Sequence, residues 1–189
     1  MFEQFFLSVQ QDIKLFLYFP ILCAIFRALF IAVHKPYPSL KGKSKALFQC
    51  FRFGFWWGMD VNAYIYLLSL LLVTLPGLFF PLWAQWGDNI RVVIGVLYSI
   101  ILYFAFVGKM IFYAQFHDIF NNIIFLGEKA EKNNLIDVFF NQYHGARKLL
   151  FLIPYIGVSY FFLKGMLGLP SIPYLHFYGA AYYGFNVLI

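Results

Sequence analysis

Polar residues that could bind a ligand gather at the edges of long apolar runs in this sequence. Tyr113, His117, Asp118 and Asn121 follow one such run, and His117 lies one helical turn from both Tyr113 and Asn121. These residue types could hold a lipid headgroup or a metal ion. Adjacent residues on a helix do not face each other, so His117 and Asp118 are a poor chelating pair, and solvation at a membrane surface is the alternative explanation.

Two further groups of charged residues flank apolar runs. Arg147 and Lys148 are adjacent basic residues, which could bind an anionic lipid headgroup or simply anchor the helix at the membrane interface. Asp60 precedes an uncharged stretch, and a carboxylate is favoured at a helix N-terminus, so helix capping alone would explain it. The functional hypothesis is that three sets of residues line an outward-facing lipid site. They are Asp60, the group from Tyr113 to Asn121, and the pair Arg147 and Lys148.

Arg27 interrupts the first apolar run. A buried arginine costs about 2.5–3.5 kcal/mol at the centre of a membrane helix on insertion scales, which makes Arg27 a functional candidate by default. The alternative is that its side chain reaches the near interface, six residues before Val33.

Patterns for other chemistry are missing. The sequence has no glycine-rich phosphate loop, no nucleophile elbow and no group of residues with metal-ligand spacing. Thr74, in the middle of an apolar run, is the single threonine, and Cys23 and Cys50 lack CxxC spacing and are interpreted as small apolar packing residues. We therefore predict no catalytic residue, metal site or cofactor within these residues.

Composition indicates the elements that must position these residues. The chain has 189 residues, of which 62% are hydrophobic and 12% charged, about half the charge of a soluble domain. A soluble globule and a disordered chain are both excluded. Because the basic residues behind the net charge of +6 lie between apolar runs, an anionic lipid surface is the expected partner rather than nucleic acid.

The few charges mark where the chain crosses the membrane, because a span needs about 20 apolar residues. Only helices or closed barrels satisfy the backbone in lipid, and no barrel-type alternation is visible. We predict an all-α multi-pass transmembrane helical bundle, with an aromatic interfacial belt before its second span. It has four full spans and the start of a fifth, at about 15–33, 61–83, 91–113, 147–169 and 175–189.

The last apolar run ends at Ile189 after too few residues to span a membrane. We interpret the sequence as a fragment cut inside a fifth helix; a short re-entrant or interfacial end is the alternative. If the loops alternate sides, the N-terminal side has three basic residues and the other side ten. The positive-inside rule then places the loop 34–58 in the cytoplasm.

The segment FRFGFWWGMDVNAYIYLLSLLLVTLP, which begins at Phe51, resembles the membrane domain of bacterial lipoteichoic acid synthase-like proteins. These are phosphoglycerol transferases of the alkaline phosphatase and sulfatase superfamily. The later segments KMIFYAQFHDIFN and VFFNQYHGARK follow the same arrangement, so the resemblance covers roughly residues 46–169. Gly58 stands where many members have an arginine, and the matching positions are Asp60, Asn62, Tyr66 and Pro76.

The resemblance implies a five-helix domain in the bacterial cytoplasmic membrane with a cytoplasmic N-terminus, opposite to the charge rule. An extracytoplasmic catalytic domain outside this chain would hold a threonine nucleophile and a Mn- or Zn-type metal. It would transfer phosphoglycerol from phosphatidylglycerol to an extracytoplasmic glycan or lipid acceptor, while this chain anchors the enzyme and presents lipid. The alternative is a small transporter or an accessory membrane subunit, with Arg27 and Asp60 facing a polar pathway.

Overall fold

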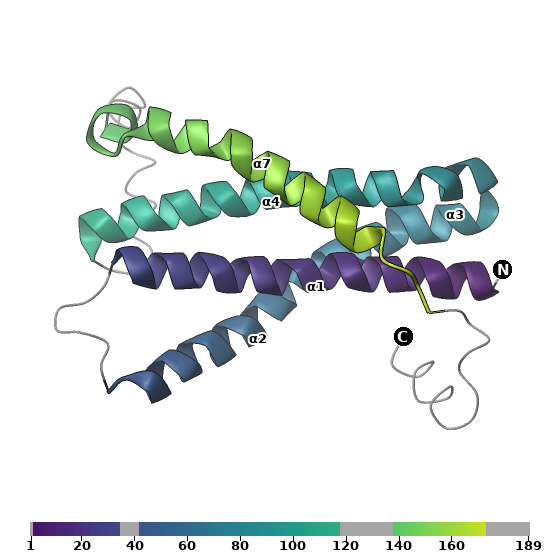
Figure 1. Cartoon of the computed structure of the whole chain (residues 1–189), viewed down its shortest axis with the longest axis horizontal. Coiled ribbons are helices and arrows are strands. Elements are labelled where there is room, and N and C mark those ends of the chain that lie inside the picture. Colours follow the sequence, from purple (N-terminus) through teal and green to yellow (C-terminus); the bar gives the residue numbers. More distant parts are fainter. Residues whose placement is uncertain (1, 35–41, 118–137, 173–189) are drawn as a thin grey trace. The chain divides into compact units, whose positions relative to one another are not determined.

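A computed structural model describes residues 2–34, 42–117 and 138–172 of the chain. Over these ranges the chain is helical and has no strand, which confirms the all-α prediction. The elements shown in Figure 1 are α1 (Phe2–Val33), α2 (Ser44–Ser69), the π-helix η1 (Leu70–Thr74), α3 (Leu75–Phe79), α4 (Pro81–Phe116), the π-helix η2 (Val138–Gln142) and α7 (Gly145–Leu167).

The described residues contain four helical segments that are long and apolar enough to cross a membrane. They are Phe2–Val33, Ser44–Phe79, Pro81–Ala114 and Gly145–Leu167. A regular stripe on α1 fits a lipid environment, because Leu17, Ile21, Ile25 and Leu29 repeat every four residues and are each about half exposed. An exposed apolar stripe of this kind would promote aggregation in water. The chain therefore has the architecture of a multi-pass membrane protein.

Two helices begin earlier than the charge pattern predicts. Helix α1 begins at Phe2 rather than near residue 15, so Asp12 lies inside it. Helix α2 begins at Ser44 rather than near residue 61, so Asp60 lies in the helix interior and cannot act as its N-terminal cap. A charged residue ends a membrane helix only when it must reach water, and Asp12 has partners inside the protein that make this unnecessary.

The boundary between α3 and α4 follows from a proline. The residue before a proline is disfavoured in the helical region, and Phe80 is extended with φ −121° and ψ 105°. Proline is well suited to the first position of a helix, and α4 begins at Pro81. Trp83 therefore belongs to α4 rather than to the second predicted span, and Arg91 lies well inside α4 rather than in front of a helix.

The fourth predicted span is displaced by two residues from α7, which runs from Gly145 to Leu167. Gly165 lies in the last helical turn of α7. The predicted fifth helix at about 175–189 lies outside the described residues.

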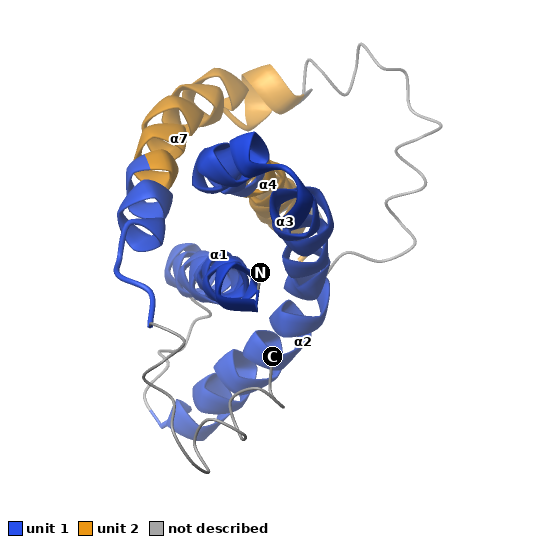
Figure 2. Ribbon diagram, turned by 90° about the vertical axis from the view of Figure 1, so that its right-hand side faces the viewer, with its two compact units in different colours: residues 1–96, 161–189 blue, residues 97–160 orange. Residues whose placement is uncertain are grey.

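The chain divides into two compact units, which Figure 2 colours separately. Unit 1 comprises residues 1–96 and 161–189, and unit 2 comprises residues 97–160. In unit 1 the helices approach closely at Gly95, where a Cβ atom would lie 2.8 Å from Leu163 Cδ1 and 3.0 Å from Leu15 Cδ1. In unit 2 the rings of Tyr103 and Tyr155 lie 5.0 Å apart. Each tyrosine also donates a hydrogen bond to a backbone carbonyl of the facing helix.

Candidate functional site

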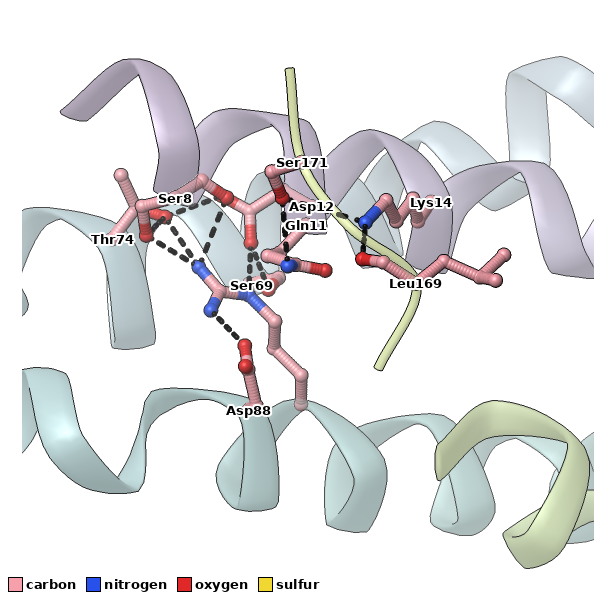
Figure 3. A network of polar contacts seen from close by, with 10 residues as sticks. Ser8, Gln11, Asp12, Lys14, Ser69, Thr74, Asp88, Leu169 and Ser171 are labelled. Carbon is pink, nitrogen blue, oxygen red and sulfur yellow. Dashed lines mark hydrogen bonds and ion pairs between the residues drawn. The ribbon is translucent and has the colours of Figure 1, made fainter. Parts of the chain in front are cut away.

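A buried ion pair joins α1 to α4 within unit 1. Asp12 is fully buried and Arg91 is 3% exposed, and Arg91 Nε donates to Asp12 Oδ1 over 2.7 Å. Two hydroxyl groups complete the environment of the carboxylate: Ser69 Oγ donates to Oδ1 over 2.6 Å, and Thr74 Oγ1 donates to Oδ2 over 2.5 Å (Figure 3). Both carboxylate oxygens are thus hydrogen-bonded.

The guanidinium of Arg91 is nearly as fully bonded as its partner carboxylate. Its Nη2 donates to the carbonyl and the hydroxyl oxygen of Ser8 over 3.1 and 2.6 Å, and to Thr74 Oγ1 over 2.9 Å. Its Nη1 donates to Asp88 Oδ1 over 3.0 Å. Removing either Asp12 or Arg91 would leave an uncompensated buried charge, which costs about 3–5 kcal/mol in measured cases.

The π-helix η1 explains how Ser69 and Thr74 both reach Asp12. At 3.6 residues per turn, residues five apart on an α-helix point about 140° away from each other. In η1 the Leu75 amide instead donates to the carbonyl of Leu70, five residues earlier. This wider turn brings positions five apart onto one face. Single π turns of this kind occur frequently at functional sites.

A tryptophan of α4 compensates for a proline in the same segment. Pro76 lacks the N–H that would bond to the Leu72 carbonyl four residues earlier. Trp83 of α4 replaces that donor, because its indole Nε1 donates to the Leu72 carbonyl over 2.8 Å. The irregular stretch η1–α3 is therefore held by side chains of α1 and α4.

A pocket of about 330 Å³ opens beside the ion pair. Its polar lining includes Ser8, Gln11 and Thr74, together with Asp88 and Arg91, and Leu7 and Leu78 contribute apolar surface. Gln11 Nε2 donates to Ser171 Oγ over 3.0 Å, but Gln11 Oε1 is buried and has no hydrogen-bond partner within residues 2–34, 42–117 and 138–172. A residue of the pocket lining thus carries an acceptor that these residues leave unused.

The segment after α7 is fixed to α1 close to this pocket. Gln10 exchanges two hydrogen bonds with the backbone of Ile172, donating to its carbonyl over 2.9 Å and accepting from its amide over 2.8 Å. Lys14 Nζ donates to the Leu169 carbonyl over 2.7 Å (Figure 3). These bonds hold Ser171 in the pocket lining.

The residues predicted to form a lipid site lie elsewhere. Asp60 is exposed on α2 in unit 1, whereas the described members of the other groups belong to unit 2. Of these, Tyr113 stacks on the exposed His117, Arg147 is exposed, and Lys148 bonds through Nζ to the Tyr143 carbonyl. Asp118 and Asn121 lie outside the described residues. The structure thus does not gather the predicted set within one unit.

The Asp12–Arg91 cluster was missed because both residues were interpreted as flanks of spans. A signal for it existed in the predicted topology. Asp12 precedes the first span and Arg91 begins the third, so alternating spans place both at the same membrane surface. Opposite charges at one level would have indicated an ion pair.

The described residues hold no group of three or more His, Cys, Asp or Glu that could bind a metal ion. Comparison with protein families, with curated proteins and with solved structures found no match for this chain.

Proposed function

We propose that this chain is a membrane-embedded domain that takes up the hydroxyl-bearing head of a membrane lipid in the pocket beside Arg91. The observation that carries this proposal is Gln11 Oε1, a buried acceptor without a partner in the described part of the chain, on a residue that lines a pocket of about 330 Å³. That volume is at the lower end of the range for small-molecule sites and suits a headgroup rather than a whole lipid. The apolar lining would contact the first part of the acyl chains.

The charges around the pocket favour hydroxyl groups over a bare phosphate. Arg91 already donates to two carboxylates, those of Asp12 and Asp88. A phosphate would have to compete with both of them for the guanidinium. A glycerol or sugar head can instead donate hydroxyl hydrogens to Gln11 Oε1 and to the exposed carboxylate of Asp88.

The resemblance to lipoteichoic acid synthase-like proteins supplies the larger context of this proposal. Phosphatidylglycerol carries the glycerol head that the pocket would accept, and a phosphoglycerol transferase domain would use the presented lipid. The membrane is then the bacterial cytoplasmic membrane. A reading frame that continues past Ile189 into a domain with a threonine and metal-binding Asp and His residues would support the transferase assignment, and a nearby stop codon would contradict it.

Lipid retention tests the pocket directly. The chain is purified in detergent, mixed with monoglucosyl diacylglycerol, phosphatidylglycerol or phosphatidylcholine, and analysed by native mass spectrometry. We expect retention of the two hydroxyl-bearing lipids over phosphatidylcholine, and a roughly tenfold loss in Gln11→Leu for one lost hydrogen bond with its desolvation. Asn62→Leu is the control, since Asn62 does not line the pocket. Equal retention of all three lipids would refute the pocket assignment.

A second candidate function rests on the ion pair itself. Ionisable residues inside membrane helices mark transport pathways in many proteins, and η1 and Pro76 interrupt the regular helix next to Asp12. A small transporter would use this cluster as a gate. Proton or solute flux into vesicles that is abolished by Asp12→Asn would favour the transporter; the lipid-presenting domain predicts no such flux.

A further inference from the structure

A second charged site lies along α1, far from the pocket. Arg27 is half-buried against α2, and its guanidinium lies directly over Gly54. A Cβ atom at Gly54 would overlap the Arg27 guanidinium, so a larger residue at this position would displace the guanidinium. Arg27 Cζ also lies 6.0 Å from the centre of the Phe51 ring. The residues of α2 thus form a cradle for the guanidinium.

No carboxylate within the described part of the chain pairs with this arginine. Arg27 Nη1 is buried and has no hydrogen-bond partner among the residues that the structure describes. A buried donor without a partner costs about 1–3 kcal/mol. An anion that accepts a hydrogen bond from the guanidinium would remove this cost.

The position of Arg27 along the helices indicates which anion can reach it. Gly54 and Thr74 are 20 residues apart on one nearly continuous helical segment, which corresponds to about 30 Å of helix. That length matches the hydrocarbon thickness of a bilayer. Asp12 and Arg27 are 15 residues apart on α1, or about 22 Å. If Thr74 and Asp12 lie at one boundary of the hydrocarbon core, Gly54 lies at the other, and the long Arg27 side chain extends to Gly54.

The surroundings of Arg27 on α2 fit a membrane interface. Lys43, Lys45 and Arg52 are exposed near the beginning of α2. Trp56 and Trp57 are more than two-thirds exposed just beyond Gly54. Basic residues that attract anionic headgroups and tryptophans at the headgroup level are the usual features of this zone.

We propose that Arg27, cradled by Gly54 and Phe51, binds the phosphate group of an anionic membrane lipid. A guanidinium matches two phosphate oxygens with parallel N–H donors, a geometry that lysine lacks. The site is distinct from the pocket beside Arg91, in its position and in the chemistry of its ligand. It would hold the α1–α2 pair to anionic lipid through a specific contact.

The test uses two lipids that differ only in phosphate. The whole chain is incubated with phosphatidic acid or with diacylglycerol of the same acyl chains, and retained lipid is measured by native mass spectrometry. We expect Arg27→Gln to retain about tenfold less phosphatidic acid, the effect of losing hydrogen bonds to a charged group. Diacylglycerol retention should not change. Arg52→Gln, which removes an exposed charge near the same end of α2, should lower retention by less than twofold.

A glycine pair provides a test that keeps the charge. Gly54→Ala places a methyl group where the guanidinium lies and should reduce phosphatidic acid retention, whereas at Gly58, one turn away, the nearest atom to a new Cβ is 3.9 Å distant. Gly58→Ala should therefore behave as the unaltered chain. If Arg27→Gln does not fold, this pair still decides the outcome.

Three results would overturn the proposal. The first is equal retention of phosphatidic acid by the unaltered chain and Arg27→Gln. The second is an equal loss in Arg27→Gln and Arg52→Gln, which would show a diffuse charge effect. The third is competition by inorganic phosphate as strong as that by a second anionic lipid, which would indicate a site for free phosphate.

Discussion

Two arginines near opposite ends of the α1–α2 pair have opposite environments. The buried Arg91 meets two carboxylates, two hydroxyl groups and a backbone carbonyl within the chain. The half-buried Arg27 meets a glycine and an aromatic ring, and one of its nitrogens has no partner among the described residues. The first arginine is a fixed part of the protein interior, and the second depends on the surrounding lipid. We therefore expect substitution of Arg91 to lower the free energy of unfolding, and substitution of Arg27 to leave it unchanged or raise it.

The largest effect is expected from Arg91→Leu. The substitution leaves Asp12 buried without its cation, and breaking a buried pair in this way costs about 3–5 kcal/mol. Thermal unfolding in detergent, followed by circular dichroism, should show a large loss of stability. Arg147→Leu, at an exposed position, serves as the control and should change little.

Thr74→Val is expected to have a smaller effect. The threonine hydroxyl donates to Asp12 and accepts from Arg91. Its removal leaves each charged group with one hydrogen bond fewer and should lower the free energy of unfolding by about 1–3 kcal/mol. Ser69→Ala removes a single bond to Asp12 and should cost less. The same unfolding measurement ranks the two variants. A larger loss in Ser69→Ala than in Thr74→Val would contradict this description of the cluster.

Trp83→Phe should cost about 0.5–1.5 kcal/mol, the value of one hydrogen bond. The indole replaces the N–H that Pro76 lacks. In a Pro76→Ala background the helix regains a backbone donor for the Leu72 carbonyl, and Trp83→Phe should then cost less. An unchanged cost in that background would show that the indole does not substitute for the missing amide.

Arg27→Leu should have the smallest effect on stability in lipid-free detergent, and its sign should be neutral or favourable. A leucine removes a half-buried charge whose Nη1 has no partner among the described residues. Adding phosphatidic acid should stabilise the unaltered chain and leave Arg27→Leu unaffected, because a ligand stabilises only the protein that binds it. Destabilisation by several kcal/mol in detergent would mean that Arg27 has a structural role like that of Arg91.

Much of the fold was predictable because hydropathy and charge report directly on burial in lipid. The fourth span was placed within two residues of α7. Helix α1 extends ahead of the first predicted span through Asp12, which pairs with Arg91 inside the protein, and α2 likewise extends ahead of the second predicted span. Pro81 could have been used to place the start of α4, since proline favours a first helical position.

The candidate site was harder to predict because it depends on how the helices are rotated about their axes. The alternation of spans places Asp12 and Arg91 at the same surface. It does not show that Ser69 and Thr74 point together, because that requires the π turn between them. The close fit of Arg27 on Gly54 likewise depends on the contact between two helices, which no spacing within either helix encodes.

A double-mutant cycle on Asp12 and Arg91 tests the central claim most directly. Unfolding free energies are measured for the unaltered chain, Asp12→Leu, Arg91→Leu and the double variant. We expect the double variant to be more stable than the sum of the single losses implies, with a coupling energy of at least about 2 kcal/mol, within the range of residues in direct contact. Additive losses would contradict the claim that this pair joins α1 to α4.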